Sequence, residues 1–203
     1  MERIVQGAEE KFAGTPSSLE DFWISIGIES YRRGEYDLAR HFLAKAWNSQ
    51  RARGGSQELV AVYLSELEFR RGDADGAVRV LEQLASSEGA SPRVLLRLGA
   101  AYMRAGRHDD SSAMLQRILR TEKDRRTRDE ALYLLAYTQY RKGDFAASLD
   151  NLNRVAGITE DRSLKAGALR IKALALKALG RPAEAARSLE DYAAIVPGDD
   201  KVR

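Results

Sequence analysis

The chain has 203 residues, and its 44% hydrophobic and 31% charged content is typical of a folded, water-soluble protein. The 33 lysine and arginine residues nearly balance 30 aspartate and glutamate residues, so the net charge of +3 does not by itself indicate a nucleic-acid partner. Cysteine is absent, which excludes disulfides and thiol chemistry in any compartment. No apolar run reaches the length of about 18 residues that a transmembrane segment needs.

Residues 1–16 are predicted to form an N-terminal amphipathic helix that caps the following structure. One side of this helix carries Ile4, Val5, Ala8 and Phe12. The segment lacks an apolar core of signal-peptide length. The sequence therefore favours a cytoplasmic location, although the mature part of an exported, periplasmic protein would look the same.

Residues 17–198 are predicted to form an array of five helical hairpins. Each hairpin contains a glycine that closes one helical stretch and precedes another: Gly34, Gly72, Gly106, Gly143 and Gly180. Glycine best adopts the left-handed conformation that ends a helix, so each one marks the turn of a hairpin. The predicted hairpins are residues 20–50, 57–87, 92–121, 127–156 and 164–195.

Three further columns keep register with these glycines. Seven positions before each glycine lies a small residue: Gly27, Ser65, Gly99, Ala136 and Ala173. Five positions after it lies another: Ala39, Ala77, Ser111, Ser148 and Ala185. Nine positions after it lies a leucine: Leu43, Leu81, Leu115, Leu152 and Leu189. Small residues allow paired helices to approach closely, and we expect the leucines to pack in a shared core.

This pattern resembles the tetratricopeptide repeat family, whose unit is a helix–turn–helix of about 34 residues. The segment from Trp23 to Gly27, followed by Gly34, Tyr36 and Ala39, is similar to the family signature, and the resemblance covers residues 20–197. It implies an all-α, right-handed α-solenoid that binds other proteins on the face formed by the first helices.

The joints and the C-terminal end of the array also have predicted roles. Residues 51–56 carry an insertion rich in glycine and are the predicted flexible joint. Residues 199–203 are read as a tail or as the start of a further repeat. Since no polar capping helix is visible, we expect either a longer array or a last hairpin that meets a partner.

Catalytic chemistry has little support in the sequence. The two histidines, His41 and His108, fall on different hairpins, and His108 occupies a packing column. The pairs Asp109–Asp110 and Asp199–Asp200 are candidate metal ligands, but aspartate is also favoured at helix starts. No phosphate-binding loop or nucleophile motif is present. We therefore expect no enzyme activity, no metal and no cofactor.

The first helices supply a candidate partner-binding groove. The groove residues combine aromatic and arginine side chains, which are common anchors of protein interfaces. They are Tyr31, Arg32, Tyr63, Phe69, Arg70, Arg93, Arg97, Met103, Arg104, Tyr133, Tyr137, Tyr140 and Arg141. Their positive charge predicts a protein or peptide partner of acidic character. Two structural alternatives stay open: arginines near helix C-termini are favourable in any case, and some rings can pack between hairpins.

Other partner classes are less well supported. In some relatives a clamp grips the acidic C-terminus of a chaperone, but its places here hold Ile24, Ile28, Tyr63, Arg93 and Arg97, of which only the arginines fit. A basic run between Arg117 and Arg128 is interleaved with acids, so a solvated loop is preferred to nucleic-acid binding. Self-assembly through uncapped ends, as a homo-oligomer or within a larger complex, is the main alternative function. A regulatory segment of a larger protein is another.

Overall fold

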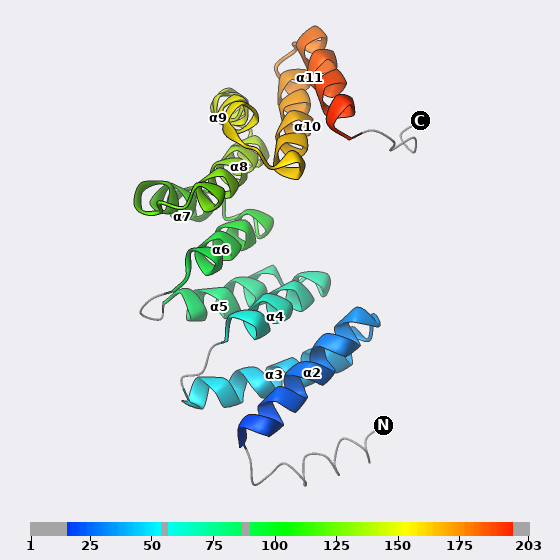
Figure 1. The fold of residues 1–203 in the computed structure, drawn as a ribbon, viewed down its shortest axis with the longest axis vertical. Helices are drawn as coiled ribbons and strands as arrows, with labels where there is room; N and C mark the ends of the chain where they lie inside the picture. Colours follow the sequence, from blue (N-terminus) through cyan, green and yellow to red (C-terminus); the bar gives the residue numbers. More distant parts are fainter. Residues whose placement is uncertain (1–15, 54–56, 87–89, 197–203) are drawn as a thin grey trace. The chain divides into compact units, whose positions relative to one another are not determined.

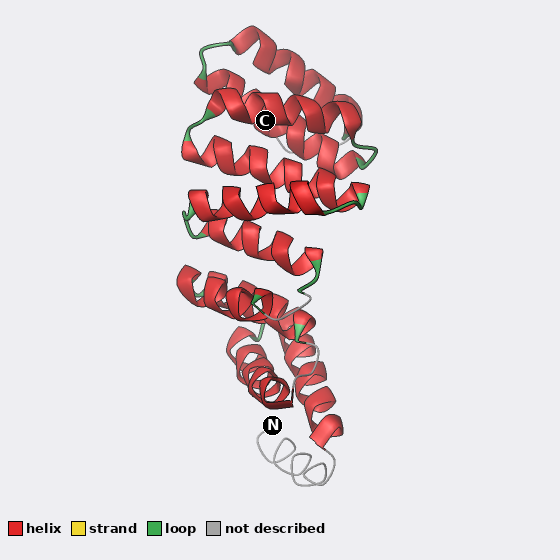
Figure 2. Ribbon diagram, turned by 90° about the vertical axis from the view of Figure 1, so that its left-hand side faces the viewer, coloured by secondary structure: helices red, strands yellow, loops and turns green. Residues whose placement is uncertain are grey.

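The computed structural model describes residues 16–53, 57–86 and 90–196, which contain helices and loops but no strand (Figure 1; Figure 2). The helices of these ranges are α2 (Pro16–Arg32), α3 (Tyr36–Arg53), α4 (Glu58–Arg70), α5 (Ala74–Ala85), α6 (Pro92–Arg104), α7 (His108–Thr121), α8 (Arg125–Lys142), α9 (Phe145–Ile158), α10 (Arg162–Ala178) and α11 (Pro182–Ile195). The all-α prediction is confirmed. The predicted N-terminal helix, the glycine-rich part of the joint and the tail lie outside the described residues.

The chain divides into two compact units, Met1–Glu88 and Gly89–Arg203. In the first unit, α2 packs on α3, α3 on α4, and α4 on α5. In the second unit, every helix from α6 to α11 packs on the next one along the chain. There the first helices of successive hairpins also pack on each other, α6 on α8 and α8 on α10, and this arrangement creates a shared first-helix face.

The five repeat glycines end the first helices as predicted. All have positive φ angles, between 72° at Gly180 and 90° at Gly143. The residue after each glycine donates its backbone N–H to a carbonyl in the last turn, for example Asp144 to Gln139 at 2.9 Å and Arg181 to Leu176 at 2.9 Å. This hydrogen bond closes the helix in a Schellman motif, which requires a left-handed residue at the glycine position.

Small side chains do bring the paired helices together. A Cβ atom on Gly27 would lie 2.6 Å from Leu43 Cγ, and one on Gly99 would lie 2.9 Å from Leu115 Cδ2. The second small column adds hydrogen bonds that the sequence pattern does not reveal. The hydroxyl of Ser111 donates to the carbonyl of Gly99 at 2.8 Å, and that of Ser148 donates to the carbonyl of Ala136 at 2.8 Å.

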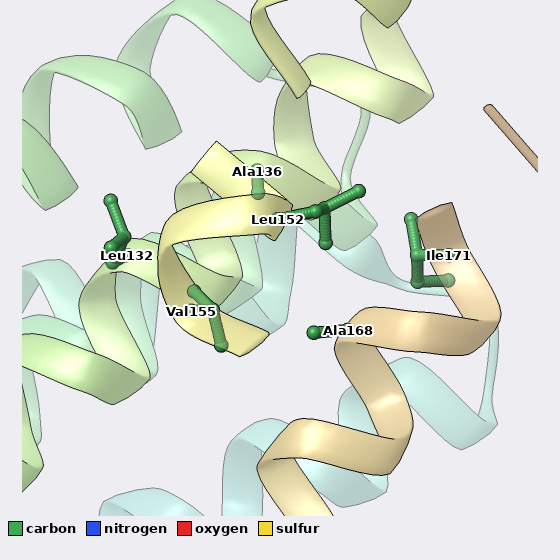
Figure 3. Close-up of a cluster of buried hydrophobic side chains, with 6 residues drawn as sticks. All are labelled: Leu132, Ala136, Leu152, Val155, Ala168 and Ile171. Carbon is green, nitrogen blue, oxygen red and sulfur yellow. The ribbon is translucent and has the colours of Figure 1, made fainter. Parts of the chain in front are cut away.

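The leucine column builds the core in four hairpins of the five. Leu43, Leu81, Leu115 and Leu152 are at most 2% exposed. In Figure 3, Leu152 of α9 points toward Ile171 of α10, within a cluster that also contains Leu132, Ala136, Val155 and Ala168. The prediction for Leu189 is wrong, because this residue of α11 is 49% exposed. No described helix follows α11 to cover it.

Polar groups at the helix ends explain where α8 and α10 begin. Asp124 accepts a hydrogen bond from the backbone N–H of Thr127, and Asp161 accepts from Ser163 and Leu164. These N-caps start both helices two residues before the predicted positions. The first residue of each of these helices also contacts the end of its own hairpin. Arg125 donates a hydrogen bond to the carbonyl of Ile158 at the end of α9, and Arg162 donates one to the carbonyl of Ile195 at the end of α11.

Candidate partner-binding surface

A cavity of about 600 Å³ lies between α6 and α8 on the first-helix face of the second unit. We call it the basic cavity. Its lining residues are Arg93, Leu96, Arg97, Ala100, Asp124, Arg126, Thr127, Glu130 and Leu134. Two of the predicted groove residues, Arg93 and Arg97, therefore share one hollow with side chains of the neighbouring first helix.

The two walls of the basic cavity differ in how far their charges are already paired. On α8, Arg126 lies 3.4 Å from Glu130, and Asp124 accepts from the backbone and the hydroxyl of Thr127. On α6, Arg93 and Arg97 are exposed and form no ion pair with any described residue. Spaced by four residues, they present two guanidinium groups on one side of the helix.

The capping role of Asp124 determines its charge state. The backbone N–H of Thr127, its hydroxyl and nearby Arg126 hold the pKa of the Asp124 carboxyl below its ordinary value. Asp124 is thus ionised at neutral pH, and both of its hydrogen bonds serve the start of α8. The free charges of the basic cavity are therefore those of Arg93 and Arg97.

The tyrosine stripe of α8 is partly structural. Tyr137 lies 6.4 Å from Tyr133 and 6.3 Å from Tyr140 between ring centroids, and all three rings pack against the core cluster shown in Figure 3. Tyr133 also touches α10, where a Cβ on Gly167 would lie 2.9 Å from its hydroxyl oxygen. Burial raises the pKa of the Tyr133 phenol, which stays neutral. The alternative that these rings pack between hairpins is therefore observed, although each ring keeps some exposed surface.

In the first unit, the aromatic groove residues surround an arginine. Tyr31 and Tyr63 form an edge-to-face pair with centroids 5.0 Å apart. The guanidinium of Arg70 lies 4.7 Å from the ring centroid of Tyr36, and its hydrogen bond with Tyr31 raises its pKa. Arg70 also lies 3.6 Å from Glu66, so this cation already has partners within the unit.

The remaining groove residues differ in how exposed they are and in the interactions they make. Arg32 and Arg141 are exposed, and Arg32 lies 3.9 Å from Glu29. Arg104 is exposed and Phe69 is half-buried, and each takes part in an interaction. The prediction that Met103 is exposed is wrong, because only 6% of its surface is accessible. The column assignment failed there because Met103 is one of the buried core residues.

Sequence analysis missed residues that shape this face. Asp124 and Arg126 line the basic cavity, although the sequence placed them only in a charged loop. A signal was present: Asp124 and Asp161 hold equivalent positions of successive hairpins, as do Arg125 and Arg162. Within the basic run, Arg125 pairs with Glu160 at 3.1 Å and Arg128 donates to the carbonyl of Glu122.

The candidate metal ligands Asp109 and Asp110 both form ion pairs with basic side chains. Asp109 pairs with Lys142, which lowers the pKa of the Asp109 carboxyl, and Asp110 pairs with Arg107 at 2.7 Å. In the part of the chain that is described, no three histidine, aspartate or glutamate residues are arranged to hold a metal ion. Asp199 and Asp200 lie outside that part. None of the described helices combines the length and apolarity needed to cross a membrane.

Comparison with known families accounts for this architecture. One tetratricopeptide repeat model matches residues 68–128, and two more match residues 130–157 and 166–191. The chain belongs to the tetratricopeptide repeat family. Tetratricopeptide repeats are generally non-catalytic modules for protein interaction, and this solenoid is a scaffold of that general kind.

Solved structures share the tetratricopeptide repeat fold. A tetratricopeptide repeat protein from Parabacteroides merdae ATCC 43184 gives a TM-score of 0.74 at 16% identity, covering 92% of this chain and 69% of that one. A putative kinesin light chain repeat structure from Podospora anserina gives 0.71 at 20% identity, covering 89% and 95%. The MamA protein gives 0.66 at 16% identity, covering 92% and 97%. A search of curated proteins found no match.

Proposed function

We propose that this tetratricopeptide repeat protein binds an acidic segment of a partner protein on the first-helix face of its second unit. The proposal rests on two arginines of the basic cavity that have no ion-pair partner in the described part of the chain. Arg93 and Arg97 line a hollow of about 600 Å³ and have no acidic partner among the described residues. Guanidinium groups bind carboxylates in bidentate geometry, so a partner's aspartate, glutamate or C-terminal carboxylate fits there.

Each such contact is weak by itself. An exposed arginine–carboxylate pair contributes about 0.2–1 kcal/mol, so affinity requires further apolar contacts along the face. Leu96, Ala100 and Leu134 supply apolar surface within the same cavity. The charges also speed association, and this effect weakens as added salt screens them.

Site-specific photocrosslinking tests the proposal. A benzoylphenylalanine placed at Ala100, inside the basic cavity, should crosslink a discrete partner in native extract. The same group at exposed Gln116 on α7 should not. The double variant Arg93→Glu/Arg97→Glu should abolish the crosslink, whereas Arg117→Glu, a matched exposed arginine on α7, should leave it intact. Equal crosslinking in both variants would show that the cavity does not recognise acidic groups.

Self-association is a second candidate function, and the exposure of Leu189 favours it. Leu152, its counterpart in the previous hairpin, is fully buried against α10, so the same side of α11 has an apolar surface that a second copy can cover. Leu189→Glu should then abolish any concentration-dependent oligomer in sedimentation velocity. Ala194→Glu, at an exposed position of the same helix, is the control.

A further inference from the structure

A second cavity, of about 400 Å³, adjoins the basic cavity across the first turns of α8. We call it the acidic cavity. Its lining residues are Asp124, Arg125, Arg126, Asp129, Glu130, Thr159, Glu160, Asp161 and Leu164. Asp124, Arg126 and Glu130 line both cavities. The acidic cavity has five carboxylates against two arginines, which is the opposite bias to the arginine wall of the basic cavity.

Most of the charged side chains that line the acidic cavity form ion pairs or cap helices. Arg125 lies 3.1 Å from Glu160, and Arg126 lies 3.4 Å from Glu130. Asp124 caps α8, and Asp161 caps α10 by accepting from the backbone N–H groups of Ser163 and Leu164. The partial positive charge at the start of each helix is thereby matched by its own N-cap carboxylate.

Asp129 is the exception. Only 6% of its surface is accessible, and it makes no hydrogen bond or ion pair with any described residue. Removing a carboxylate from water without a partner is unfavourable, and buried charges in proteins are normally paired. Asp129 nevertheless lines an open cavity rather than a closed core, so a group that enters the cavity can reach it.

We propose that the acidic cavity receives a guanidinium or ammonium group from a side chain of the partner protein. An anion is disfavoured by the excess of carboxylates, and no described residues form a metal-binding group. This inference rests on the proposed function and deepens it. The bound segment carries an acidic residue for Arg93 and Arg97 and a basic residue for Asp129, one on each side of α8. The partner is thus of mixed charge rather than uniformly acidic.

Small blocked amino acids test the acidic cavity without knowledge of the partner. Nα-acetyl-arginine amide and Nα-acetyl-lysine amide are titrated into the ¹⁵N-labelled full chain. Saturable shifts are expected at the backbone amides of Asp129, Thr159 and Leu164, and Nα-acetyl-glutamine amide should cause none. Asp129→Asn should weaken the cationic probes about tenfold or more. Asp150→Asn, the same change at an exposed site of α9, should have no effect. Absence of saturable shifts, or equal binding to Asp129→Asn, overturns the proposal.

Thermal unfolding provides an independent readout. If Asp129 is held in the cavity without a structural partner, Asp129→Asn should raise the unfolding midpoint, by about 2–4 °C for a chain of this size. A lowered midpoint would mean that the carboxylate serves the fold, and the inference would fail. Arg97→Glu should leave binding of the cationic probes intact. The proposed function fails if partner crosslinking survives Arg93→Glu/Arg97→Glu, whereas this inference fails if the cationic probes do not bind or bind Asp129→Asn equally well, so the two failures can be distinguished.

Discussion

The fourth and fifth hairpins carry the same repeat pattern but bury it differently. Leu152 and Leu189 both lie nine residues after the repeat glycine, yet the first is fully buried and the second is 49% exposed. The difference lies in the neighbour. Helix α9 lies between α8 and α10, whereas α11 packs on α10 and no described helix follows it. Leu152 therefore contacts both its own hairpin and the next one, and its complete burial depends on α10 as well as on α8.

The largest effect expected from this comparison is on the free energy of unfolding. Leu152→Ala removes a fully buried side chain from the cluster of α8, α9 and α10 and should destabilise the chain by about 2–5 kcal/mol. Leu189→Ala should cost clearly less because its side chain is already half in water. Urea unfolding followed by circular dichroism measures both. Equal losses would mean that α11 is covered in solution.

Substitution in the column of small residues seven positions before each repeat glycine should have the next largest effect on the free energy of unfolding. Gly99→Val places a branched side chain where even a Cβ would lie 2.9 Å from Leu115, and overpacking of this kind costs about 1–3 kcal/mol. Gly157→Ala, at a helical glycine with no neighbouring atom within 4 Å, should instead stabilise by about 0.4–1 kcal/mol. If both substitutions shifted the urea midpoint in the same direction, close helix approach would not explain the column.

Helix capping is a local interaction, so its contribution to stability should not depend on whether a further hairpin packs on the helix. Asp161 caps α10 through two backbone hydrogen bonds, so Asp161→Ala should destabilise by about 0.5–2 kcal/mol. Asp191→Ala, an exposed change in α11, serves as the reference and should be close to neutral. Comparable losses for the two substitutions in urea unfolding would contradict the capping role.

The smallest expected effect is on the way stability falls at acidic pH. The pKa of Asp124 is lowered in the folded chain by its hydrogen bonds to Thr127, so its ionised form is favoured by folding. The resulting stability is fully present above its ordinary pKa of 3.8 and is lost as the pH falls through the lower folded-state value. Asp124→Asn should therefore reduce the loss of thermal stability on acidification below that pH. If the thermal stability of Asp124→Asn depended on pH as that of the unmodified chain does, ionisation of Asp124 would not be coupled to folding.

Parts of the candidate binding face could be predicted from spacing, and parts could not. Arg93 and Arg97 were identified because an interval of four residues places side chains on one side of a helix. The same reasoning included Met103 among the exposed groove residues and failed, since Met103 belongs to the buried core and spacing along one helix does not say which of its sides other helices cover. The partial burial of Tyr133 likewise depends on the approach of Gly167 from α10, which no local pattern encodes.

The sequence alone determined the number of hairpins, their turns and the sites of close helix contact. Those features depend on backbone conformation at glycine and on side-chain size, both properties of single positions. Only the tertiary structure decided which leucine is left in water, which arginines lack a partner and where Asp129 is buried. These outcomes depend on the side chains that neighbouring helices bring to the same place, and one-dimensional spacing does not contain that information.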